Sequence, residues 1–142
     1  MSAERPVDGA DIDAALAQGG VRFEPGDALL LDCGRDIFER KVGEWGEQEV
    51  KPGSGAGVAE WLADSKASLL LWDMLDTISD KEISGAVHQV HWAIGLVLVD
   101  NCSYEQARSL LAERGQGDGG LVIGPLLVDG ATGCNVNPML IL

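Results

Sequence analysis

The sequence predicts an α/β fold. Four short apolar runs, at residues 28–33, 68–72, 96–99 and 121–128, have the length and composition of buried strands. Segments with helical spacing of apolar residues lie between these runs, and clusters of Gly and Pro separate the two kinds of element. Strands that alternate with helices along a chain are typical of a sheet flanked by helices.

The first half of the chain is expected to hold three helices and two strands. Residues 11–17 form the first predicted helix, because Ile12, Ala15 and Leu16 share one face and Gly19-Gly20 ends it. A turn at Pro25-Gly26 leads into strand 28–33. The other elements expected here are helix 37–42, helix 58–64 and strand 68–72. The Gly-rich stretch 53–57 between them is read as a plain connection rather than an anion cradle, because it lacks the P-loop lysine.

The second half is expected to begin with a polar loop over residues 73–83. A short helix over 85–93 and strand 96–99 follow it. Ser103 and Gln106 have the spacing of a capping box, which would start a helix that runs to about Arg114. Its inward side would be formed by Tyr104, Ala107, Leu110 and Leu111. Pro125 interrupts the last strand, 121–128, and therefore favours an edge position.

Length, charge and cysteine content restrict the class of protein. A chain of 142 residues suits one domain over residues 1–142. The net charge of −13 disfavours nucleic acid and anionic membranes as partners. Residues 1–13 do not resemble a signal peptide, and no apolar run is long enough to span a bilayer. Three widely spaced cysteines fit a reducing compartment, so a cytoplasmic protein is expected.

Three stretches carry a resemblance to a known family. They are Val21–Leu31, with its Pro-Gly-Asp strand entry, the helix–strand segment Gly57–Leu62 with Ser68–Asp73, and the closing run Pro125–Pro138. In this order they resemble the cyclase-family metal-dependent hydrolases, which include bacterial kynurenine formamidase. The resemblance covers nearly the whole chain and implies a cyclase-like (swivelling β/β/α-like) domain with a mixed sheet. Asp73 and Asp76 fall where members of that family commonly carry acidic residues.

The resemblance also implies part of a catalytic site. Kynurenine formamidase-like members have a His and then, after a short helix and strand, a Glu, and both lie at the metal site. His88 matches that His, and Asp100 falls at the Glu position. The family's His-x-Gly-Thr-His-x-Asp pattern, which supplies the principal metal ligands, is absent, and His88 and His91 are the two histidines of the chain. The chain is therefore expected to resemble the family's C-terminal part, without its full metal site.

The residues themselves leave several roles open. His88 could act as general acid or base with Asp100 as its orienter, or it could be a structural histidine bonded to a backbone carbonyl. His88, His91 and Asp100 are weak candidates for a metal site, so no metal is assigned, and Zn or Mn is expected only if a partner chain supplies ligands. Cys102 and Cys134 are expected to pack rather than react. The side chains expected to contact substrate are Trp72, Asp73, His91 and Trp92, with core packing the alternative for the tryptophans.

An absent N-terminal segment would leave apolar surface uncovered. A patch of several hundred Å² costs on the order of 10 kcal/mol when it stays in water. The expectation is therefore a homo-oligomer, or a hetero-oligomer with a chain that supplies the segment.

Three functions compete at this point. The first is an enzyme of secondary metabolism that acts on a small molecule, either by hydrolysing a cyclic amide or formamide or by closing or dehydrating a ring. The second is a non-catalytic ligand-binding or structural subunit. The third is a half-enzyme that another chain completes.

Overall fold

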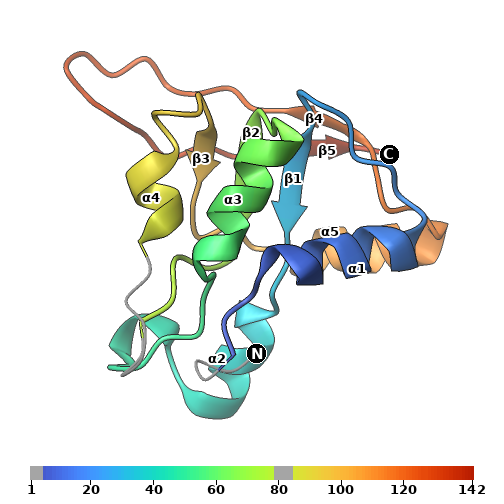
Figure 1. The fold of residues 1–142 in the computed structure, drawn as a ribbon, viewed down its shortest axis with the longest axis horizontal. Helices are drawn as coiled ribbons and strands as arrows, with labels where there is room; N and C mark the ends of the chain where they lie inside the picture. The colour runs from blue at the N-terminus through green and yellow to red at the C-terminus, as the bar shows by residue number, and fades with distance from the viewer. Residues whose placement is uncertain (1–4, 79–84) are drawn as a thin grey trace.

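The computed structural model describes residues 5–78 and 85–142 (Figure 1). Its elements, in chain order, are α1 (Gly9–Gly19), β1 (Ala28–Leu31), α2 (Arg35–Val42), the 3₁₀ turn η1 (Trp45–Glu47), α3 (Ala56–Ser65), β2 (Leu69–Trp72), α4 (Ala86–Val90), β3 (Val97–Val99), α5 (Glu105–Arg114), β4 (Gly120–Val122) and β5 (Met139–Ile141). This order confirms the α/β class, and parallel and antiparallel pairing are both present.

A three-stranded parallel sheet forms the centre, in the order β1-β2-β3. Ala28 pairs with Leu69 and Leu69 with Val97, so the three strands run in register toward the same edge. The central strand β2 is an unbroken apolar run, as expected for a strand covered on both faces. Side chains that follow the strands therefore meet at one edge of the sheet, where β2 gives way to Asp73 and β3 to Asp100.

Helices α1, α3 and α4 cover one face of this sheet. In Figure 1, α3 crosses in front of the strands, while α5 lies behind α1. The buried cluster joins Ile12 of α1, Val58 and Leu62 of α3 and Val87 of α4 to the side chains of Leu70 and Trp72 on β2. Burial of these apolar side chains, at about 25 cal/mol per Å² of apolar surface, is the main force that holds the layers together.

Glycines in the connection before α3 allow close packing. A Cβ on Gly57 would lie 1.7 Å from Oδ1 of Asp8, the residue that caps α1. A Cβ on Gly53 would lie 2.4 Å from the carbonyl oxygen of Leu75. The Gly-rich stretch therefore serves as a packing joint between α1, α3 and the residues around Asp76.

Several expectations about the second half are wrong. Ser103 does not cap α5, because the helix starts one residue later, at an N-cap Tyr104 that makes no side-chain capping bond. Leu110 was expected inside but is 49% exposed. The last strand extends only from Gly120 to Val122, and it pairs antiparallel with β5, which no sequence pattern indicated. Part of the expected loop 73–83 lies outside the described residues.

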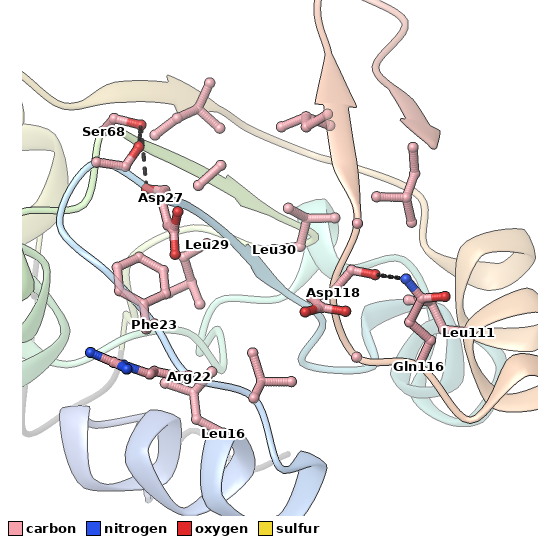
Figure 2. A pocket seen from close by; sticks show the side chains of 18 of the residues that line it. Leu16, Arg22, Phe23, Asp27, Leu29, Leu30, Ser68, Leu111, Gln116 and Asp118 are labelled. Carbon is pink, nitrogen blue, oxygen red and sulfur yellow. Dashed lines mark hydrogen bonds between the residues drawn. The ribbon is translucent and has the colours of Figure 1, made fainter. Parts of the chain in front are cut away.

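The second face of the sheet is only partly covered, beside β1. A cavity of about 870 Å³ lies between β1, the end of α1 and the β4 strand (Figure 2). Leu16 and Phe23 line it on one side, Leu30 on the sheet, and Leu111 and Leu121 on the other. No residue from 105 to 142, a stretch that the structure describes in full, is buried. None of the described helices is both long enough and apolar enough to cross a membrane.

Candidate functional site

The buried carboxylate of Asp76 organises the site. It follows β2 by a short loop and is 7% exposed. Ser54 donates its hydroxyl to Oδ1 of Asp76 over 3.2 Å, and the backbone N–H of Val87 donates to the same oxygen, also over 3.2 Å. Asp76 thus ties the Gly-rich stretch to the first turn of α4. Exposed N–H groups at a helix start need acceptors, and a carboxylate suits that end of the helix dipole.

His88 projects from α4 between two carboxylates. Its Nδ1 lies 2.7 Å from Oδ2 of Asp76, and its Nε2 lies 3.3 Å from Oδ2 of Asp100. The imidazole ring also stacks on the indole of Trp72, with centroids 5.7 Å apart and an interplanar angle of 27°. The side chain remains 40% exposed. His88 is therefore fixed at both nitrogens and on one ring face, yet it can be reached from solvent.

Asp100 is held from the core side. It comes directly after β3, and Nε1 of the fully buried Trp72 donates to its Oδ1 over 2.5 Å. Its other oxygen faces His88, and its side chain is 35% exposed. The structure therefore brings His88 and Asp100 together, the two residues that the sequence singled out as a pair.

The two carboxylates change the protonation of His88. Partial burial alone would lower the pKa of this imidazole, but the hydrogen bonds that the ring donates to Asp76 and Asp100 outweigh it, and the pKa is raised above the ordinary value of 6.5. An imidazolium can donate from Nδ1 to Asp76 and from Nε2 to Asp100 at once, whereas the neutral ring has only one N–H. The arrangement therefore favours the protonated form of His88 more than solvent alone would, at a ring that a bound molecule could reach.

The four residues expected to contact substrate occupy different environments. Trp72 is fully buried, and Asp73 is 3% exposed, with its two oxygens accepting the backbone N–H groups of Cys33 and Arg35 over 2.9 and 2.8 Å. Burial raises the pKa of Asp73, although these two backbone bonds partly offset the effect. Nδ1 of His91 faces the carbonyl oxygen of Leu96 at 3.2 Å, and Trp92 is 75% exposed. Their contact with substrate stays a prediction.

Sequence reasoning missed the role of Asp76. The resemblance pointed to this position only as an acidic one, and nothing in its spacing links its side chain to His88. The nearest usable signal was the pair Asp73 and Asp76 directly after an apolar strand. Ligand-binding side chains tend to gather at the carboxyl ends of strands in such sheets.

The donor set does not make a complete metal site. Nε2 of His88 and Oδ2 of Asp100 are close enough to share an ion. Nδ1 of His88, however, is hydrogen-bonded to Asp76, and Nδ1 of His91 lies at hydrogen-bonding distance from the backbone carbonyl of Leu96. Within residues 5–78 and 85–142, no group of three or more His, Cys, Asp or Glu side chains is arranged to hold a metal. A zinc site usually needs three or four protein ligands. The described residues therefore do not fit the family's metal centre by themselves.

Cys33 and Cys102 lie in environments that disfavour thiolates. Burial raises the pKa of the Cys33 thiol, and the nearby carboxylate of Asp73 adds to this. Burial likewise raises the pKa of Cys102, whose Sγ lies 3.5 Å from the carbonyl oxygen of Val99. Both therefore remain thiols, which are poor nucleophiles.

Comparisons with known proteins identify the family. Residues 2–77 match the family model described as "Putative cyclase". A solved structure described as the crystal structure of a novel cyclase has the same fold, with a TM-score of 0.80 at 20% identity, over 97% of this chain and 47% of that one. The chain thus spans about half the length of this solved relative, and no curated protein matches it. Because the family model covers more than half of the 142 residues, the chain belongs to the cyclase family.

Proposed function

We propose that the chain carries an acid–base site of a small-molecule enzyme, with His88 as the group that moves the proton. The reaction we favour is hydrolysis of a cyclic amide or formamide, with closure or dehydration of a ring as the related alternative. The observation that carries the proposal is the doubly bonded imidazole, with Nδ1 on buried Asp76 and Nε2 turned to Asp100 at a surface that solvent can reach.

The roles of the three residues follow from their positions. Asp76 is a positioning residue, because it fixes the ring orientation and keeps a proton on Nδ1. Nε2 is then the nitrogen that exchanges a proton with the substrate, and it gives up its contact with Asp100 when it does so. In amide hydrolysis the neutral imidazole would take a proton from a water molecule while that water attacks the carbonyl carbon. The resulting imidazolium would return that proton to the departing nitrogen as the C–N bond breaks.

A metal remains a further proposal, since Zn or Mn would need ligands beyond those of the described residues. A metal so bound would polarise the carbonyl oxygen and acidify water. The proton transfers assigned to His88 do not depend on it.

The experiment compares wild type with His88→Gln on a panel of formanilides, lactams and cyclic imides. General acid–base catalysis contributes typically about 10²- to 10⁴-fold, so we expect kcat to fall by at least about a hundredfold. Gln89→Ala, at the next residue of α4 and outside the site, is the matched control and should keep its rate. Far-UV circular dichroism of both variants checks that each is folded.

Retention of wild-type kcat by His88→Gln would overturn the catalytic proposal. If wild type turns over nothing in the panel but binds one of these compounds in calorimetry, the chain is a ligand-binding subunit instead.

A further inference from the structure

Arg35 joins the ends of the three parallel strands. It opens α2, after β1, and its backbone N–H donates to Oδ2 of Asp73, after β2, over 2.8 Å. Its guanidinium Nη1 donates to the carbonyl oxygen of Asp73 over 3.5 Å and also to the side-chain oxygen of Asn101, after β3. One side chain thus contacts the ends of both other strands, at the edge of the sheet where the candidate site lies.

The guanidinium of Arg35 is held in place by its own surroundings. Nε donates to Oε1 of Glu39, one helical turn later, over 2.9 Å, and the guanidinium carbon lies 5.2 Å from the ring centroid of Trp45. Trp45 is buried, and a cation over the face of an aromatic ring is attracted to it. Because the Arg35 side chain is only 23% exposed, these contacts fix the guanidinium independently of Asn101.

The turn after β3 is tied at two places. The φ angle of Asn101 is 56°, in the left-handed region that residues other than glycine rarely adopt and that Asn tolerates better than most. Its side chain accepts the bond from Arg35. One residue later, the N–H of Cys102 donates to the carbonyl oxygen of Trp72 over 2.9 Å. The turn is therefore anchored through the backbone at Cys102 and through a side chain at Asn101.

Asp100 lies between this turn and the end of β3, so the turn sets the direction of its carboxylate. Oδ1 accepts the indole N–H of Trp72 over 2.5 Å, while Oδ2 lies 3.3 Å from Nε2 of His88. The second distance is long for a hydrogen bond, so a small movement of Asp100 would break that contact. We propose that Arg35 is a positioning residue of this site. Acting through Asn101, it holds the Asp100 carboxylate against His88.

The test follows the position of Asp100 through the indole N–H of Trp72, because the bond to Oδ1 slows exchange of that proton with solvent. Arg35→Met keeps an unbranched apolar stem and removes the donors, so the Asp100 carboxylate should move. A hydrogen bond to a charged group is strong enough that its loss should speed exchange of the Trp72 indole signal about tenfold or more. NMR spectra of the indole N–H signals in wild type and variant measure this.

The matched control is Arg40→Met. Arg40 lies on the same helix and pairs with Asp36 and Glu105, so the same change there should leave exchange of the Trp72 indole at the wild-type rate. The indole of Trp61, bonded to Asp13, serves as an internal reference in each spectrum. Equal acceleration in Arg35→Met and Arg40→Met would overturn the inference.

Two changes at residue 101 test the intermediate contact. Asn101→Gly keeps the left-handed backbone without steric cost but removes the acceptor for Arg35, so the Trp72 indole should exchange as fast as in Arg35→Met. Asn101→Asp retains an acceptor and should exchange at the wild-type rate. Wild-type exchange in Arg35→Met or in Asn101→Gly overturns the inference, and so does fast exchange in Asn101→Asp. If circular dichroism shows that Arg35→Met does not fold, the pair at residue 101 decides.

Turnover separates this inference from the proposed function, on which its effect on rate rests. A displaced Asp100 should lower kcat by up to about a hundredfold with little change in KM, because the geometry around Nε2 of His88 is disturbed. A wild type that turns over nothing defeats the proposed function, while indole exchange still decides what Arg35 holds. Fast exchange with an unchanged kcat would remove Asp100 from the proposed mechanism and leave its positioning by Arg35 established.

Discussion

The indole of Trp72 supports His88 and Asp100 at once: it stacks on the imidazole at 5.7 Å between centroids and donates its N–H to the carboxylate. Trp72 is the last residue of the central strand and is fully buried, so its position is set by the core. The geometry of the candidate site therefore depends on core packing as much as on the loop that carries Asp76.

Replacement of Asp76 by Asn should lower the pKa of His88. The change removes the negative charge nearest to Nδ1 while keeping the size of the side chain, and that charge helps to hold the pKa above its ordinary value. An NMR titration of the imidazole carbon signals measures the shift. Asp129→Asn, in the C-terminal segment, should leave the pKa unchanged, and a titration of His88 that does not move in Asp76→Asn would contradict the assignment.

Replacement of Trp72 by Phe should destabilise the fold more than Trp61→Phe. Both changes remove an indole N–H bonded to an aspartate, to Asp100 in one case and Asp13 in the other. Trp72 is fully buried, so a cavity adds to the lost bond and the cost should be about 2 kcal/mol, against less than about 1 kcal/mol at the partly exposed Trp61. Urea unfolding monitored by circular dichroism measures both. Equal losses would show that the Trp72 site relaxes without a cavity.

Replacement of Asp73 by Ala should loosen the turn after β1. The backbone N–H groups of Cys33 and Arg35 would lose their acceptors, and each unsatisfied group costs about 1–3 kcal/mol when it stays buried. Asp73→Asn keeps one oxygen and should lose less. Thermal unfolding of the two variants gives the order, and an Ala variant as stable as the Asn variant would rule out this capping role.

The stability that His88 contributes should depend on pH in a defined direction. Its pKa is raised in the folded state, so its contribution is complete below the unfolded value of 6.5 and is lost as pH rises through the folded value. The difference in unfolding free energy between wild type and His88→Gln should therefore be larger near about pH 6 than near about pH 9. Chemical denaturation at the two pH values checks this, and a difference that grew with pH would reverse the sign of the argument.

The sequence predicted the three central strands but not their parallel pairing. The strands expected at 28–33, 68–72 and 96–99 are observed at 28–31, 69–72 and 97–99, and they were visible because their apolar runs stand between Gly and polar residues. His88 and Asp100 were predicted as a pair from the family resemblance, and they lie together because α4 and β3 are consecutive elements.

The rest depended on contacts that are distant in sequence. Asp76 contacts His88, twelve residues later in the chain, and Ser54 contacts Asp76 although α3 and β2 lie between them in the sequence. The strand 139–141 was missed because its pairing with β4 joins residues that are distant in the chain, which no local pattern shows. The expected capping box at Ser103 failed because Tyr104 is drawn inward by its hydroxyl bond to the carbonyl of Leu71.

Arg108 joins α5 to the segment that follows β1. From α5 its guanidinium binds Asp32, after β1, at 2.6 Å and Asp36, on α2, at 3.0 Å. Since no residue of α5 is buried, the ion pairs of Arg108 take the place of the apolar packing that usually holds a helix. Surface ion pairs weaken as mobile ions screen them. High ionic strength should therefore weaken the attachment of α5 while the parallel core, which includes β3, stays folded.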